Sequence, residues 1–177
     1  KANIKGFAVN AKRELKQLDN GLYELSFRAK SWAAKLDEVS TFRLDGSSIQ
    51  PANYQYTQSA LGKKRERSLA FHRAEQRISS TEKDNTQDIS NTNNTALDKL
   101  NYQLQLQFDL LNNKTDLQYN IADKGRLKSY RFDIIGEETL DTALGQLTTV
   151  KVNVIRENTH KTTHIWFAKD WDYLLVQ

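Results

Sequence analysis

The feature of this sequence that most constrains its fold is an alternation of apolar and polar residues, interrupted by turn signals about every 10 to 15 residues. Residues 23–29 alternate in this way, and residues 146–157 do so most clearly. Strands whose side chains point alternately toward a core and toward solvent produce this period of two. Turn signals such as Asp45-Gly46 and residues 123–125 separate the alternating runs. The pattern predicts a meandering antiparallel sheet.

The apolar content indicates a thin core. Hydrophobic residues make up 38% of the 177 residues, and charged residues make up 27%. A sheet that is covered on one side, or a wide curved sheet, needs fewer apolar residues than a sheet covered on both sides. A chain of this length fits one domain. We therefore expect a single β-rich domain over residues 1–177, built on an open, curved antiparallel sheet.

Two segments depart from the alternation. Residues 79–95 are mostly polar, and we expect them to form an exposed polar loop with at most one short strand. In residues 97–111 the apolar side chains fit both a helical and a strand spacing. The length of this segment, its Leu and Gln content and its lack of Val, Ile and Thr favour a helix packed on the sheet. Thr95 is its expected N-cap, and Asn112 its expected C-terminal stop.

The net charge of +4 has a local origin. Residues 63–77 hold six basic and two acidic residues, so the rest of the chain is balanced. A hydrated hairpin tip is the simplest interpretation of this segment, and a surface that binds an anionic partner is the alternative. Neighbouring tyrosines would suit single-stranded nucleic acid. The basic residues are Lys63, Lys64, Arg65, Arg67, Arg73 and Arg77.

No arrangement of residues points to catalysis or to a metal. The chain has no Cys, which excludes disulfides, thiolate metal sites and a Cys nucleophile. His160 and His164 are four residues apart in strand-forming sequence, where about 3.3 Å per residue separates their Cα atoms by roughly 13 Å, too far for one ion. We expect two surface histidines, no metal, no cofactor and no enzymatic activity.

An acidic group beside a glycine is the remaining candidate for acid–base chemistry. It consists of Glu137, Glu138 and Asp141, within residues 136–144, which we expect to form a short connection that ends at Gly145. A catalytic carboxyl would need burial that raises its pKa, and nothing in the neighbouring sequence predicts a cleft. The favoured interpretation is a solvated turn.

Large aromatic side chains offer the one candidate for ligand binding. Most simply, they belong to the core or to a sheet edge. The alternative is that a subset lines a concave apolar face that could hold an acyl chain. This subset is Trp32, Phe42, Tyr54, Tyr56 and Phe71.

The last third of the chain carries a recognisable pattern in four stretches, residues 125–132, 136–145, 147–152 and 166–170. It resembles the bacterial domain-of-unknown-function family 3108, and a weaker likeness extends back to about residue 20. Leu175 departs from the pattern, because the family usually has a proline there. The resemblance implies a secreted, periplasmic protein of Gram-negative bacteria, with a half-barrel sheet and a helix on its concave side.

That resemblance orders the functional hypotheses. The first is a periplasmic, non-enzymatic binding or carrier module for an apolar or amphipathic, lipid-like ligand, held between the sheet and the helix. The second is a structural or interaction protein of the cell envelope that docks a protein partner or an anionic surface. In an envelope, anionic lipid headgroups suit the basic segment better than nucleic acid does. No run approaches the roughly 18 apolar residues of a membrane span, and because the chain starts at Lys1, a signal peptide would already have been removed.

Overall fold

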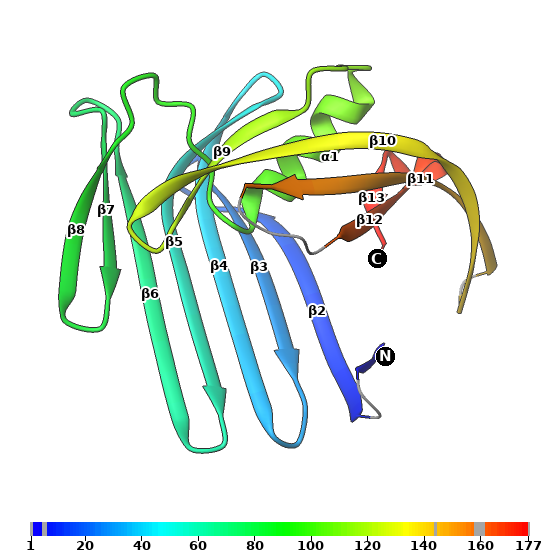
Figure 1. Ribbon diagram of the computed structural model, residues 1–177, viewed down its shortest axis with the longest axis horizontal. Coiled ribbons are helices and arrows are strands. Elements are labelled where there is room, and N and C mark those ends of the chain that lie inside the picture. The colour runs from blue at the N-terminus through cyan, green and yellow to red at the C-terminus, as the bar shows by residue number, and fades with distance from the viewer. Residues whose placement is uncertain (1, 5–6, 144, 158–161, 177) are drawn as a thin grey trace.

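Two antiparallel sheets and one α-helix make up the structure, a computed structural model that describes residues 2–4, 7–143, 145–157 and 162–176 (Figure 1). The larger sheet contains β1 Ala2–Ile4, β2 Phe7–Gln17, β3 Tyr23–Lys30, β4 Ala34–Asp45, β5 Ser48–Ala60, β6 Lys63–His72, β7 Arg77–Glu82 and β8 Asn85–Ser90. The smaller sheet contains β9 Gln118–Asp123, β10 Arg126–Thr142, β11 Gly145–Arg156, β12 Thr163–Ala168 and β13 Leu174–Leu175. The helices are α1 Asn101–Leu111 and the short 3₁₀ helix η1 Lys169–Trp171.

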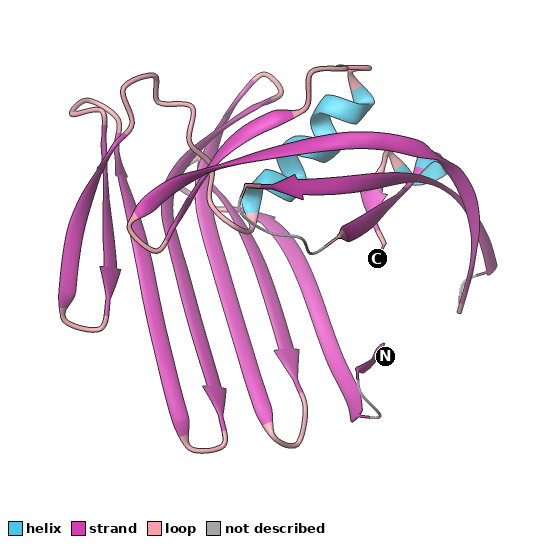
Figure 2. Ribbon diagram, viewed as in Figure 1, coloured by secondary structure: helices cyan, strands magenta, loops and turns pink. Residues whose placement is uncertain are grey.

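In the larger sheet each strand pairs with the next one along the chain, from β1 to β8. The expected turn at Asp45-Gly46 joins β4 to β5, and the turn at residues 123–125 joins β9 to β10. The mainly β architecture with one sheet curled into a half-barrel is therefore confirmed (Figure 2).

The expected loop over residues 79–95 is wrong for most of its length, because β7 and β8 form a hairpin there. Ile78 lies opposite Ile89, and these side chains are 0% and 7% exposed. Two buried isoleucines thus hold the hairpin on the core, and Ser80, on the same face as Ile78, is buried beside them at 7% exposure. The sequence pattern hid this because β8 presents only one large apolar residue.

The expected connection over residues 136–144 is also wrong. β10 runs through it to Thr142 and pairs with β11 from Tyr130 to Thr142. The register shifts between Ile134 and Gly136, where Gly136 has a φ of +156°. Such a bulge bends a strand without ending it, so this glycine marks a bend where we expected a turn. The two strands curve together away from the rest of the sheet (Figure 1).

The helix is confirmed, but it begins at Asn101, four residues after the expected start. Residues 96–98 are extended instead, because Leu97 pairs in parallel with Ile121 of β9. Asp98 replaces Thr95 as the capping residue. Its Oδ1 accepts the backbone N–H groups of Leu100 and Asn101, both at 2.8 Å. Asn112 follows the last helical residue, as expected.

The core lies between the larger sheet, α1 and the smaller sheet. We call the face of the larger sheet that packs against α1 the inner face, and Leu25, Phe42, Tyr54 and Leu69 on it are at most 5% exposed. Figure 1 shows that α1 and the smaller sheet cover the inner face only near the β4–β5 turn. Toward the β3–β4 and β5–β6 turns, which we call the open end, β2 to β6 continue past this cover.

Candidate functional site

A belt of charged residues crosses the inner face where the core ends. We call it the polar belt, and it consists of Arg13, Glu38, Arg67 and Glu82. On β4, Glu38 lies two residues before the buried Ser40, on the same face, and accepts a 2.9 Å hydrogen bond from the Tyr54 hydroxyl. Burial raises the pKa of Glu38, and this hydrogen bond and the charge of Arg13 oppose that rise. Arg13 of β2 is held in turn by Gln103 of α1, whose Oε1 accepts a 2.6 Å hydrogen bond from the guanidinium. Glu38 and Arg13 thus each have a neutral hydrogen-bond partner, Tyr54 and Gln103.

The belt continues onto β6 and β7. Arg67 donates from Nε to Glu82 at 2.9 Å, and its guanidinium lies 5.2 Å from the ring centroid of Tyr56. This ion pair is half-exposed, so its contribution to stability is about 0.5 kcal/mol. Its main effect is to hold Arg67 in place across the sheet.

An apolar strip follows the belt toward the open end. The β3–β4 register places Ala29 opposite Leu36, and the β4–β5 register places Ala34 opposite Ala60. Because alternate residues share a face, these four side chains continue the inner face beyond Glu38. Leu36, Ala29 and Ala34 border a shallow recess of about 120 Å³ together with Val9 of β2. These residues are partly exposed.

Three cations border the apolar strip on the same face. Lys63, Arg65 and Arg67 lie opposite Ala60, Gln58 and Tyr56. Lys64 and Glu66 alternate with them, so they point to the other face, where they form a 2.7 Å ion pair. Among the described residues, Lys63 and Arg65 form no ion pair. The pleat of one strand therefore divides the predicted basic segment between two faces.

The other members of the predicted basic patch lie elsewhere. Arg77 is held by Glu75 and Asp88, and the distance to Asp88 is 3.0 Å. Arg73 follows β6 at the opposite end of the sheet and lies at the rim of a separate cleft. The six cations thus do not form one surface.

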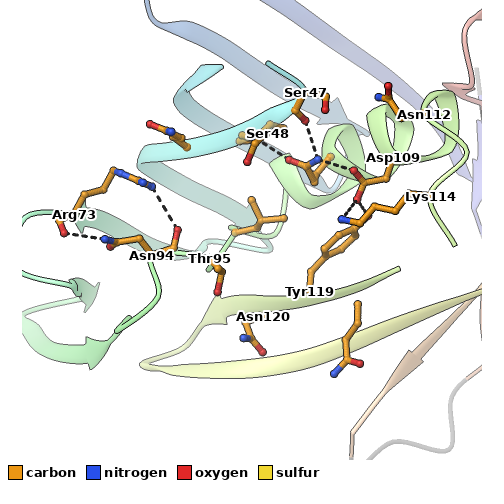
Figure 3. A pocket seen from close by; sticks show the side chains of 15 residues that line it. Ser47, Ser48, Arg73, Asn94, Thr95, Asp109, Asn112, Lys114, Tyr119 and Asn120 are labelled. Atoms are coloured by element: carbon orange, nitrogen blue, oxygen red, sulfur yellow. Dashed lines mark hydrogen bonds and ion pairs between the residues drawn. The ribbon is translucent and has the colours of Figure 1, made fainter. Parts of the chain in front are cut away.

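That cleft has a volume of about 620 Å³ (Figure 3). It lies between the β4–β5 turn, α1, β9 and the segment before residue 97. Most of the residues that line it carry amide, hydroxyl or charged groups, and Ile49, Leu97 and Tyr119 add apolar surface.

The buried carboxylate in the cleft is satisfied within the fold. Asp109 is 5% exposed and accepts hydrogen bonds from the Tyr119 hydroxyl (2.7 Å), Gln105 Nε2 (3.0 Å) and Lys114 Nζ (3.2 Å). Figure 3 shows Lys114 and Tyr119 close to the Asp109 carboxylate. A carboxylate with three donors has little capacity left for a ligand. We interpret Asp109 as an anchor between α1 and β9.

The structure separates the predicted aromatic set. Phe42 and Tyr54 are core residues, 0% and 4% exposed. Tyr56 and Phe71 pack against the core from its margin. Trp32 lies in the β3–β4 turn and is 77% exposed. Only Tyr56 borders the apolar strip, so the five rings do not form one binding face.

The acidic group of β10 is paired. Glu138 accepts hydrogen bonds from the Trp166 indole N–H and from Lys151, and Glu137 pairs with Lys169 at 2.6 Å. The indole donor is the main reason why the pKa of Glu138 lies below its ordinary value. A carboxyl with a lowered pKa is ionised at neutral pH and is poorly suited to act as a general acid.

Only one residue of the predicted histidine pair lies among the described residues. His164 lies on β12 in edge contact with Trp166, and His160 lies outside the described residues. Within the described part of the chain, no three potential ligands gather in a way that could hold a metal ion. No helix there is long and apolar enough to cross a membrane.

Sequence reasoning missed the residues that define the inner face beyond the core, namely Arg13, Glu38, Leu36 and Ala29. The alternation of β4 contains the signal. Once Phe42 is taken as buried, residues at even numbers from 34 to 40 share its face. Assigning the polar belt needs the partners across the sheet, which one sequence does not reveal.

Comparison with known proteins places the chain by family and by fold. A family model described as "Protein of unknown function (DUF3108)" matches residues 7–177. No curated protein matches. Among solved structures, the chain is similar to a β-barrel-like protein of the domain of unknown function DUF1849 from Brucella abortus, with a TM-score of 0.55 and 11% sequence identity. The alignment covers 94% of this chain and 78% of that one. At this identity the likeness concerns the fold alone.

Proposed function

The chain belongs to the DUF3108 family, and we propose that it is a non-enzymatic binding module of the Gram-negative periplasm. Its ligand is amphipathic, with an apolar chain and an anionic headgroup. The observation that carries the proposal is the adjacency of the apolar strip to Lys63 and Arg65 on one uncovered part of the inner face. The periplasmic location is supported by the likeness of residues 125–176 to secreted members of the family.

The apolar strip and the neighbouring cations could bind two parts of one molecule. A hydrocarbon chain could lie in the pleat along the apolar side chains of Ala29, Ala34 and Leu36. Each CH₂ group removed from water there contributes about 0.8 kcal/mol. Arg65 lies opposite Gln58, one pair from Leu36 on the same face, because Leu36 pairs with Gln58. A carboxylate or phosphate bound by its guanidinium would hold the head of the molecule.

This proposal moves the ligand away from the interface of sheet and helix, where core side chains such as Leu104 and Leu106 fill the space. The cleft beside α1 has the volume of a ligand site. Its polar lining favours a polar molecule, however, and its buried carboxylate is already satisfied.

Binding of a fluorescent fatty acid to the purified protein tests the proposal. We expect Leu36→Ser and Arg65→Gln each to weaken binding by about tenfold, because each removes roughly 1.4 kcal/mol of contact. Val39→Ser and Lys64→Gln are the matched controls, since these residues belong to the same strands but point to the opposite face. A wild-type protein that binds no fatty acid and no lysophospholipid, or that binds equally in all four variants, would contradict the proposal.

A further inference from the structure

Two exposed apolar side chains lie in neighbouring turns at the open end. Trp32 in the β3–β4 turn is 77% exposed, and Leu61 in the β5–β6 turn is 82% exposed, the highest values among the exposed large apolar residues of the described structure. A backbone hydrogen bond from Leu61 N to Ala33 O, at 3.4 Å, connects the two turns. Figure 1 shows both turns at the end of the molecule away from α1.

Leu61 combines an exposed apolar side chain with a backbone conformation that leucine rarely adopts. It has a φ of +48° and Gly62 has a φ of +76°, so both residues of the two-residue turn are left-handed. Asn-Gly or Asp-Gly is strongly preferred in such a turn, because a β-carbon followed by a bulky group clashes at positive φ. A residue that is strained and exposed points to a function of the side chain itself.

The turn that carries Trp32 has a defined conformation. Ser31 Oγ accepts the backbone N–H groups of Ala33 and Ala34 at 3.3 and 3.1 Å, and Ser31 N donates to Ala34 O at 2.8 Å. These bonds close a tight loop with Trp32 at its apex. The indole is therefore presented outward by an ordered turn.

Basic residues surround the two apolar side chains. Residues 30–35 and 60–65 together hold five basic residues and no acidic one. Two of the five, Lys35 and Lys64, form 2.7 Å ion pairs with Asp37 and Glu66, which lie further along the strands. The five are exposed, and they are Lys30, Lys35, Lys63, Lys64 and Arg65.

We propose that this open end docks on an anionic lipid bilayer. Trp32 and Leu61 enter the interfacial region, and the surrounding cations bind lipid phosphates. A protein partner fits the surface less well, because two protruding side chains do not make an apolar interface core, and lysine is depleted from such cores. A row of stacking rings for nucleic acid is also missing among the described residues of these turns. The inference goes beyond the proposed ligand and stands without it.

Co-sedimentation of the protein with vesicles tests the docking surface. We expect wild-type protein to bind vesicles of phosphatidylglycerol mixed with phosphatidylcholine, to bind pure phosphatidylcholine weakly, and to dissociate when salt is added. Trp32→Ser and Leu61→Asn should each weaken binding on the order of tenfold. The triple variant Lys30→Gln, Lys35→Gln, Lys64→Gln should weaken it on the order of a hundredfold, since each cation contributes roughly fivefold.

Matched controls separate this surface from general effects of charge and folding. Lys16, Arg43 and Lys124 are exposed basic residues away from these turns, and their joint change to Gln should leave vesicle binding intact. Leu61→Asn improves the turn, so lost binding in that variant cannot come from unfolding. Fatty acid binding in solution should be unchanged in Trp32→Ser and Leu61→Asn, which distinguishes docking from ligand binding. Wild-type protein that ignores anionic vesicles would overturn the inference and leave a protein partner for the two turns. Binding that survives in the tip variants would also overturn it.

Discussion

At the scale of single residues, Asp98 is the most consequential side chain outside the proposed site. It is 0% exposed and joins the start of α1 to β4, where Ser40 Oγ donates to its Oδ2 at 2.6 Å. Asn101 Nδ2 donates to the same oxygen at 2.7 Å, and Asn101 Oδ1 accepts the Asp98 N–H at 2.9 Å. The sequence did not single out Asp98, because its long-range partner Ser40 on β4 cannot be inferred from local spacing.

Removing this carboxylate should destabilise the whole domain. We expect Asp98→Ala to lower the free energy of unfolding by about 3 kcal/mol, because two helix N–H groups and two side-chain donors lose their acceptor inside the core. Urea denaturation followed by circular dichroism measures the change. Asp116→Ala, at an exposed position, is the control and should stay within about 0.5 kcal/mol of wild type. Equal effects in both variants would contradict the role of Asp98.

The same residue predicts a dependence on pH. Burial raises the pKa of Asp98 from 3.8 to about 6, against the hydrogen bonds that favour its charged form. Between these two pH values the folded chain binds more protons than the unfolded chain does. The contribution of Asp98 to the free energy of unfolding is therefore lost as pH rises from about 4 to about 6. Relative to Asp98→Asn, which cannot titrate, wild type should gain up to about 3 kcal/mol as pH falls through that window. A constant difference between the two proteins across this range would refute the shift.

At the scale of elements, alternation and turn residues predicted strands well, and glycine was the least reliable signal. Gly46 does mark a turn, whereas Gly136 marks a bulge inside a 17-residue strand. A turn and a bulge both fit a glycine between two β-forming runs, and only the pairing with β11 distinguishes them. The polar hairpin of β7 and β8 was missed because its burial rests on Ile78 and Ile89, one large apolar residue for each strand.

The β5–β6 hairpin gives a prediction of its own at this scale. Leu61→Asn should raise the free energy of unfolding by about 1 kcal/mol, because asparagine tolerates the left-handed conformation that leucine resists. Thermal unfolding of the variant beside wild type measures this. Leu61→Val is the opposite control, since a β-branched residue at positive φ should destabilise. A loss of stability in Leu61→Asn would mean that the leucine side chain supports the fold.

At the scale of the whole molecule, the half-barrel is closed at one end and open at the other. The closed end holds the core and the polar cleft, whose buried carboxylate, Asp109, is satisfied internally. The open end brings together an apolar strip, two inner-face cations and two exposed apolar turn residues. Composition predicted a curved sheet and a thin core, but which aromatic rings are buried depends on how far α1 and the smaller sheet reach. That is why Trp32 and Phe42 have opposite environments.

The most direct test of the proposed function is a nuclear magnetic resonance titration of the labelled protein with a lysophospholipid. The account predicts that amide shifts will cluster on the inner face of the open end, at Ala29, Leu36, Gln58 and Arg65. Shifts that cluster instead around Asn94, Gln105 and Lys114 would place the ligand in the polar cleft and contradict the account.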